Sequence, residues 1–234
     1  MPAAFARAAA CISIAFLVAP GWVMSAEEWT LRRHDPELDV IVHDRGMPQG
    51  YREFRGVTHV ESRLSAFVAM LQDVERMPEW LYRVERVVTI DEVGPLENYS
   101  YTVISLPWPF RDRDSIVHAI LSQDPATQEI TLRASAVPDH LPSEKGYIRM
   151  PLIESLWRFT PLADGRTRVE FSGHADPGGR LSSGLLATFQ SKLIWQSPYN
   201  TLRNLHGIIG RPEYQAAEYA FIEEPRIWNA AATD

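Results

Sequence analysis

The chain has 234 residues, of which 45% are hydrophobic and 23% are charged, a balance typical of a globular protein rather than a fibrous or disordered one. The formal net charge is −7, and no run of five or more lysine and arginine residues occurs, which argues against nucleic acid as a partner. No repeat with a period of about 20 to 50 residues is visible, which argues against solenoids and propellers. A chain of this length is expected to form one domain with room for a cavity.

Residues 1–26 have the layout of a secretory signal peptide. Arg7 precedes an apolar stretch over 8–18, and the small residues Ser25 and Ala26 follow. The stretch is shorter than the roughly 20 residues that a membrane-spanning helix needs. We therefore expect this segment to be removed, with cleavage after Ala26 or after Ser25, and the rest to be exported to the periplasm. An uncleaved membrane anchor is the alternative.

The single cysteine, Cys11, lies in that apolar stretch. The exported chain would hold neither a disulfide bond nor a cysteine-ligated metal, which suits a bacterial periplasm. The seven histidines include no pair at i, i+4 spacing, so we expect no metal site. No nucleophile elbow, zinc-protease motif, phosphate-binding glycine loop or dinucleotide fingerprint occurs, and we expect no cofactor.

The first elements of the exported chain are predicted to be two strands and a helix. Residues 38–43 and 51–60 have extended character on either side of a turn at 45–50. Apolar residues then recur at helical spacing, with Ser62 as the expected N-cap and Pro78 as the expected end of the helix. These apolar positions are Leu64, Phe67, Val68, Leu71 and Val74.

The central part of the chain alternates between apolar and polar residues, and this period of two predicts strands. Turn-forming residues such as Asp164 and Gly165 separate the segments. A helix inserted among hairpin-linked strands indicates an antiparallel sheet of the α+β class. The predicted strands span residues 84–93, 101–106, 115–121, 129–136, 152–160 and 166–174.

A long helix is predicted over 182–209, after a turn at 176–179. Its apolar stripe has helical spacing, and Pro198 is expected to kink the helix rather than end it. A curved sheet with one long amphipathic helix suggests a helix held in the concave face of the sheet. The tail, residues 211–234, carries aromatic residues among acidic ones, and the sequence leaves open whether it packs on the body.

Segment 106–114 places four alternating charges after a tryptophan that lies between two prolines. For Arg111 and Asp112 the expected role is surface salt bridging. Arg113 differs, because strand alternation places its side chain on the same face as that of Ser115. If that face is the concave one, the guanidinium points to the interior and has to find an acid or a ligand.

Six short segments follow one another in a specific order: PWPFRDRD at 107–114, GYIRMP at 146–151, LWRFTP at 156–161, GRTRV at 165–169, DPGG at 176–179 and PYNTL at 198–202. This order resembles the START domain, the StAR-related lipid-transfer family, over roughly residues 30–210. The resemblance implies a helix-grip fold. In such a fold a curved antiparallel sheet, its inserted helices and a long C-terminal helix enclose a hydrophobic cavity for one lipid or other hydrophobic molecule.

The resemblance also implies ligand-binding residues. Arg113 matches an arginine that lies at the cavity of lipid-binding members. Its acidic partner is left open among Asp91, Glu92 and Glu97. Trp157 matches a tryptophan of the strand motif W-x-x-x-P, for which core packing and ligand contact are equally good explanations. The apolar face of the final helix adds Leu185, Phe189 and Leu193.

We therefore expect residues 27–210 to form one lipid-binding domain, followed by the tail. The expected function is non-catalytic binding, and transfer, of a lipid or other hydrophobic ligand by a monomer that contacts membranes transiently. Burial of an acyl chain contributes about 0.8 kcal/mol per CH₂ group. One rival is a cyclase- or aromatase-like enzyme, which needs an acid–base pair within reach of the ligand. The other is an interaction module whose apolar groove takes a segment of a partner.

Overall fold

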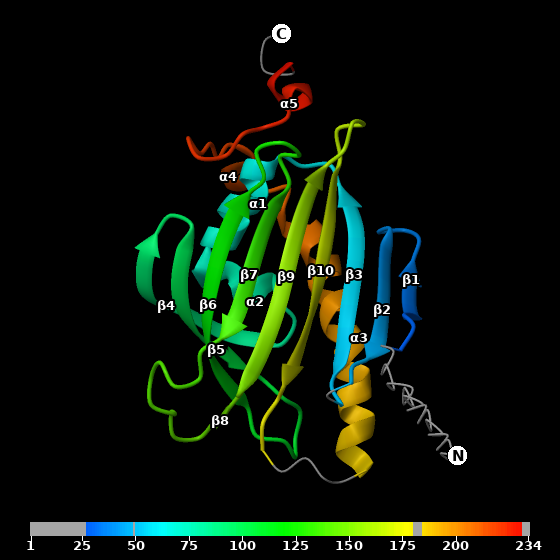
Figure 1. Cartoon of the computed structure of the whole chain (residues 1–234), viewed down its shortest axis with the longest axis vertical. Coiled ribbons are helices and arrows are strands. Elements are labelled where there is room, and N and C mark those ends of the chain that lie inside the picture. Colours follow the sequence, from blue (N-terminus) through cyan, green and yellow to red (C-terminus); the bar gives the residue numbers. More distant parts are fainter. Residues whose placement is uncertain (1–26, 49, 180–183, 231–234) are drawn as a thin grey trace, which may run out of the picture.

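One curved sheet, with a long helix against its concave face, makes up most of the protein (Figure 1). The computed structural model describes residues 27–48, 50–179 and 184–230, with the backbone alone for residues 184–191, 229 and 230. Neighbouring strands are antiparallel along the order β1-β2-β3-β10-β9-β7-β6-β5-β4, while β8 runs parallel to β6. The predicted α+β class and helix-grip architecture are confirmed.

Every segment with a period of two forms a strand, although β5 begins at Glu97 rather than at residue 101. The sequence prediction missed β1 and β8. The residues of β1 are exposed along nearly the whole strand, so no apolar alternation marked it, and β8 has only two residues. The strands are β1 (Thr30–Asp35), β2 (Val40–Gly46), β3 (Arg52–Val60), β4 (Val84–Gly94), β5 (Glu97–Ile104), β6 (Arg113–Gln123), β7 (Ile130–Ala136), β8 (Ile148–Arg149), β9 (Leu152–Pro161) and β10 (Thr167–Asp176).

Helix α1 (Leu64–Gln72) begins differently from the prediction. Ser62 is not its N-cap, since Arg63 occupies that position and makes no side-chain capping bond. The backbone N–H groups of Leu64 and Ser65 instead donate to the carboxylate of Glu224, at 3.1 and 2.7 Å. A carboxylate at a helix N-terminus satisfies the free N–H groups and opposes the helix dipole. The cap comes from the other end of the chain, where no local pattern could reveal it.

Pro78 does not end α1 either. The helix stops at Gln72, and η1 (Val74–Arg76) and α2 (Met77–Trp80) follow. Pro78 lies in the first turn of α2, where its missing N–H has no partner to lose. The proline therefore starts a helix, and the prediction that it closes one was wrong.

Helix α3 (Gly184–Ile208) matches the predicted long helix and continues through Pro198. Its second half is anchored by Leu202 and Leu205, which are fully buried in the core. Helix and sheet approach each other closely at Gly56 in β3, because a Cβ added there would lie only 2.7 Å from a methyl carbon of Leu202 and 3.3 Å from the Cβ of Pro198. Glycine at this position allows the close approach.

The tail packs on the body, which settles the question that the sequence left open. It contains α4 (Pro212–Gln215) and α5 (Arg226–Ala230), at the end of the molecule opposite to the start of α3 (Figure 1). Tyr214 and Ile222 belong to the hydrophobic core, and the Tyr214 hydroxyl donates to Asp73 at 2.9 Å. Residues 211–224 thus complete the core around α1.

Candidate ligand-binding site

The concave face of the sheet divides into rows of large side chains and rows of small ones. Residues paired across neighbouring strands point to the same face, so paired positions form rows across the sheet. One row carries Leu121, Leu132, Trp157 and Phe171, which belong to the core or pack against it. The rows nearer to the start of α3 carry Asn98, Ala119, Ala134, Ser155 and Gly173, and then Ser100, Val117 and Ala136.

Trp157, one of the residues predicted from the sequence, lies in the aromatic core and is 4% exposed. Its ring stacks on Phe171 with centroids 4.0 Å apart, and Trp80 meets it edge-on at 5.7 Å. This geometry is that of a residue packed in the core, the first of the two explanations considered for Trp157. The residue stands at the boundary between the large-residue rows and the small-residue rows.

The small-residue rows leave unfilled space on the concave face. Ala119, Ala134, Ala136 and Ser155 are only half-buried although they lie on the same face as the core. Inward-facing residues that keep accessible surface indicate that the interior is not packed there, since protein cores otherwise fill such space. We call this part of the concave face the hollow, and it is the candidate ligand-binding site.

The other residues predicted to bind the ligand belong to the final helix. Leu193 lies on α3 and is half-buried. The side chains of Leu185 and Phe189 lie outside the described residues.

Arg113 is the charged residue at this end of the concave face, and only 3% of its surface is exposed. Its Nε donates to the carbonyl of Pro177 at 2.8 Å and its Nη2 to that of Gly178 at 3.5 Å, while Nη1 donates to the carbonyl of Arg111. Burial, followed by the charge of Arg111, lowers the pKa of Arg113. The guanidinium thereby holds the turn that leads from β10 towards α3.

None of the three acids considered from the sequence contacts this arginine. Glu97 pairs with His118, whose Nε2 lies 2.7 Å from its carboxylate, while Asp91 and Glu92 are exposed. Among the described residues, no carboxylate forms an ion pair with Arg113.

Ser115 is a site residue that the sequence analysis did not single out. It lies two positions after Arg113 in β6, on the same face, and is fully buried. Its hydroxyl oxygen has no hydrogen-bond partner among the described residues. Strand alternation could place Ser115 beside Arg113, but only the packing reveals that the hydroxyl is unpaired.

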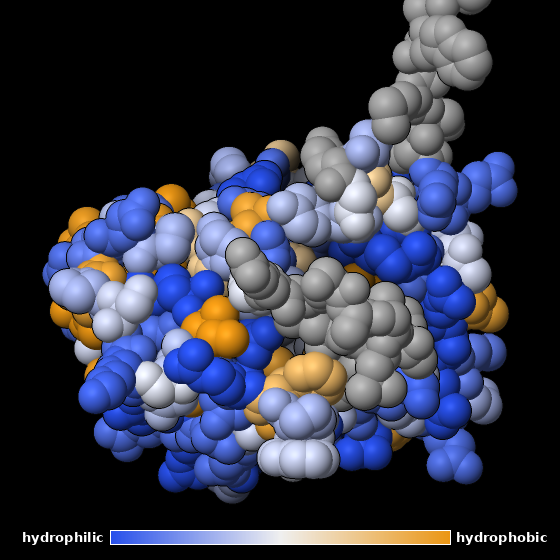
Figure 2. Space-filling view, turned by 90° about the horizontal axis from the view of Figure 1, so that it is seen from below, coloured by the Kyte–Doolittle hydropathy of each residue, from blue (hydrophilic) through white to orange (hydrophobic). Residues whose placement is uncertain are grey.

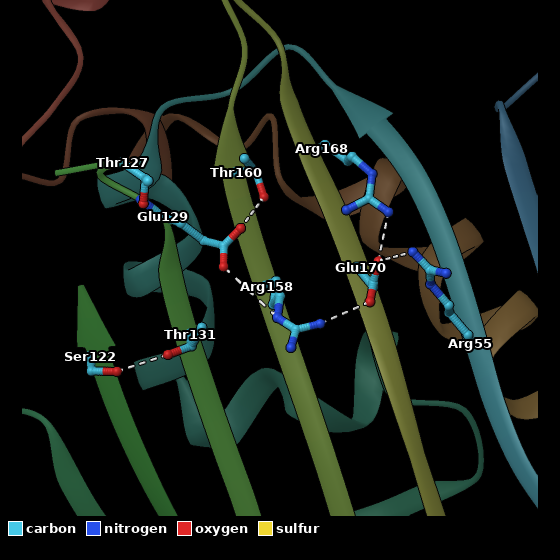
Figure 3. Close-up of polar contacts among 9 residues, drawn as sticks. All are labelled: Arg55, Ser122, Thr127, Glu129, Thr131, Arg158, Thr160, Arg168 and Glu170. Atoms are coloured by element: carbon cyan, nitrogen blue, oxygen red, sulfur yellow. Dashed lines mark hydrogen bonds and ion pairs between the residues drawn. The ribbon is translucent and has the colours of Figure 1, made fainter. Parts of the chain in front are cut away.

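The outer face of the sheet is polar, and ion pairs connect β3, β10, β9 and Glu129, the residue before β7 (Figure 3). Glu170 in β10 accepts from Arg55 of β3 at 2.8 Å and from Arg158 of β9 at 3.1 Å. Burial alone would raise the pKa of Glu170, but the hydrogen bonds from Arg55 and Arg168 outweigh it and lower that pKa overall. Arg158 also faces Glu129 at 3.8 Å. By strand register, this network lies behind the aromatic core, between the pair Phe171 and Trp157 and the pair Val169 and Phe159.

The loop between β5 and β6 extends at the end of the sheet where α3 begins, and it carries Trp108 with 92% of its surface exposed. Figure 2 looks at the molecule from this end, where hydrophobic residues lie among hydrophilic ones. Within the described ranges, no helix is long and apolar enough to cross a membrane. No three His, Cys, Asp or Glu side chains of those ranges come together in a way that could hold a metal ion.

Comparisons with known proteins agree with this geometry. The START domain family model matches residues 7–194. An uncharacterized protein of Pseudomonas aeruginosa is 28% identical over 182 residues, which are 77% of this chain and 86% of the relative. The crystal structure of a STAR-related lipid transfer protein from Xanthomonas axonopodis is 30% identical, with a TM-score of 0.69, over 78% of this chain and 99% of that one.

A more distant structure shares the fold alone. The lipid transfer and protein localization domain of human StarD13 is 14% identical, with a TM-score of 0.64, over 80% of this chain and 90% of that one. The family match spans most of the chain, and the matched region includes the strands that form the hollow. The chain therefore belongs to the START domain family and is similar to its bacterial members.

Proposed function

We propose that the protein binds one lipid or other hydrophobic molecule in the hollow between the sheet and α3 and carries it without chemical change. The observation that carries the proposal is the set of small, half-buried residues on the concave face, Ala119, Ala134, Ala136 and Ser155. The name of the Xanthomonas axonopodis protein, a lipid transfer protein, supports the same reading.

The energy of such binding comes from burial of apolar surface. At about 0.8 kcal/mol per CH₂, a chain of about sixteen carbons gains on the order of 10 kcal/mol, before the cost of immobilising it is subtracted. This gain retains a lipid without a covalent bond. A polar head then needs only a few hydrogen-bonding groups to fix its orientation.

Exchange of a lipid requires contact with a membrane, and the exposed Trp108 is the proposed contact. Tryptophan favours the boundary between water and lipid, because its ring is apolar and its N–H is polar. The loop lies at the end of the sheet where β10 leads towards α3, so a membrane at this end would face the hollow. Export through residues 1–26 belongs to the proposal and would bring the monomeric protein into contact with bacterial membranes.

A pair of substitutions on one strand tests the site. Ala119 faces the hollow, whereas Ile120 is 42% exposed on the outer face of β6. Ala119→Phe should fill the hollow and remove the hydrophobic molecule that native mass spectrometry detects on the purified protein. Ile120→Phe is the matched control and should keep it.

The result can contradict the proposal in two ways. If Ala119→Phe folds and carries the same molecules in the same amounts, the ligand does not occupy this hollow. If Ala119→Phe does not fold while Ile120→Phe does, the interior has no spare space and the observation behind the proposal is wrong.

A further inference from the structure

A groove of about 560 Å³ lies on the outer face of the sheet, between β4, β5 and the loop that joins β7 to β8. Val88 of β4 pairs with Tyr101 of β5, which in turn pairs with Ile116 of β6. Ile116 and Ala119 point to opposite faces of β6, so the groove lies on the face away from the hollow. Its volume is within the range of small-molecule sites, about 300–1,000 Å³.

The loop that closes the groove, residues 137–147, has a fixed position. Arg149, paired with the buried Asp114 at 2.8 Å, donates to the carbonyls of residues 138, 141 and 142. Arg111 donates to the carbonyls of residues 146 and 147, at 3.3 and 3.1 Å. Between these anchors, Glu144 accepts from the Tyr101 hydroxyl of the sheet. The groove is therefore preformed, which lowers the cost of binding a ligand in it.

The walls of the groove carry apolar side chains that remain in contact with water. Val88 on the sheet side is 46% exposed, and Leu141 on the loop side is 39% exposed. Exposed apolar side chains that gather at one place indicate a surface that another molecule covers. A ligand of this groove thus has an apolar body.

The charges of the groove leave one cation without a counter-charge. Arg86 and Glu144 pair at 3.3 Å and balance each other. Lys145, which also lines the groove, takes part in none of the ion pairs among the described residues. Charge complementarity therefore favours a ligand with a single negative charge.

A peptide fits this place less well than a small molecule does. β4 is at the end of the strand order, and extended peptides bind such edges as an added strand. The pairing of β4 with β5 shifts register between residues 84 and 86, 89 and 91, and 92 and 94. Irregularities of this kind disfavour the addition of a further strand.

We infer that this groove is a ligand-binding site separate from the hollow, for a small amphiphile with an apolar body and a single negative charge. The apolar body contacts Val88 and Leu141, and the charge pairs with Lys145. The inference goes beyond the proposed function, because it concerns the opposite face of the sheet and needs no ligand in the hollow.

Two fluorescent compounds test the inference on the full-length protein. The first, 1-anilinonaphthalene-8-sulfonate, has an apolar ring system and one negative charge, and N-phenyl-1-naphthylamine is its uncharged counterpart. Both fluoresce strongly in apolar surroundings, so titration gives their affinities. Because apolar compounds also enter the hollow, matched variants of the groove locate the site.

The apolar contact is tested on β4. Val88→Ser should weaken the binding of both compounds about fivefold or more, because it removes apolar surface from the groove. Leu141→Ser should do the same from the loop side. Ile120→Ser is the matched control, since Ile120 is 42% exposed on the same face but does not line the groove. It should leave both affinities unchanged, and all three variants should keep the melting temperature because the side chains are exposed.

The charge is tested on the two lysines of the chain. Lys145→Gln should weaken the binding of the sulfonate alone, about two- to fivefold, as expected for an exposed ion pair, and the difference should vanish at about 1 M salt. Lys192→Gln, an exposed lysine of α3 outside the groove, is the matched control and should bind both compounds as the parent does.

The outcomes separate the parts of the inference. If Val88→Ser and Leu141→Ser bind both compounds as tightly as Ile120→Ser does, the groove is not a binding site and the inference is overturned. If Lys145→Gln and Lys192→Gln bind the sulfonate equally, the negative charge of the ligand is overturned and the apolar site remains. Neither result affects the proposed function, which Ala119→Phe tests in the hollow.

Discussion

Arg113 and Asp114 are consecutive residues of β6 that hold chain segments on opposite faces of the sheet. Arg113 donates to the carbonyls of Pro177 and Gly178 on the concave side. Asp114 accepts from Arg149, whose guanidinium also donates to the carbonyls of residues 138, 141 and 142. One strand end therefore fixes two loops at the end of the sheet where α3 begins.

Asp114→Asn should destabilise the protein strongly. The side chains of Asp114 and Arg149 are 1% and 9% exposed, and breaking a buried pair leaves an uncompensated charge, at a cost of about 3–5 kcal/mol. We expect a decrease in melting temperature of about 10 °C by differential scanning calorimetry. Asp164→Asn, which removes an exposed pair with Arg166, should leave the melting temperature unchanged. Equal effects of the two substitutions would contradict the structural role of Asp114.

His206 should make stability depend on pH. Its Nε2 lies 2.8 Å from the hydroxyl oxygen of Thr58, which itself donates to the carbonyl of Leu38, so the ring donates to Thr58. Burial lowers the pKa of His206 below its usual 6.5, against the smaller opposing effect of Asp39 and Asp35. The unfolded chain then binds the proton more readily than the folded chain does.

The sign of the pH effect follows. The contribution of His206 is fully present above about pH 6.5 and is lost as the pH falls through the pKa of the folded state. The free energy of unfolding, measured by urea denaturation between pH 8 and pH 5, should decrease with acidification. His206→Gln should flatten this dependence. An unchanged slope in that variant would show that other groups cause it.

Three substitutions of glycine by alanine should lower the free energy of unfolding by different amounts. A Cβ at Gly173 would lie 2.3 Å from the backbone oxygen of Glu154, where nothing can move aside easily. At Gly56 the nearest atom belongs to the side chain of Leu202, and at Gly94 nothing lies within 4 Å. We expect Gly173→Ala to be the most destabilising, Gly56→Ala to be intermediate, and Gly94→Ala to remain within about 0.5 kcal/mol of the parent. Denaturation midpoints provide the ranking, and any other order contradicts this packing.

Export can be checked by mass. If residues 1–26 form a cleaved signal peptide, the protein recovered from its host should begin near Glu27. Intact-mass spectrometry distinguishes this product from the full chain. Retention of residues 1–26 on most molecules, in the membrane fraction, would favour the uncleaved anchor.

Local patterns predicted most of the fold, because α3 and every strand except β1 and the two-residue β8 bury one face and so repeat with the period of their geometry. The predictions failed where a distant segment supplies a partner. The cap of α1 comes from Glu224, and the carbonyls that hold Arg113 come from Pro177 and Gly178. Sequence spacing placed the side chain of Arg113 on the same face as that of Ser115, but it did not indicate which residues the guanidinium contacts.

For the candidate site, the sequence could predict which residues share a face of a strand, but not which residues become neighbours across strands. The alternation in β6 put Arg113 and Ser115 on one side, and the small residues of β7 could be read from the sequence. The hollow itself depends on the row that Ala119, Ala134 and Ser155 form across three strands. Rows depend on strand register, and register is set by pairing between segments that are far apart in the chain.

The position of Glu224 has a consequence for biosynthesis. The carboxylate that caps α1 is made 160 residues after Leu64, and the core residues Tyr214 and Ile222 also come long after α1. While the ribosome is still adding these residues, the core is open at that end and α1 lacks its cap. Helix α1 can therefore reach its final packing only after residue 224 has emerged from the ribosome.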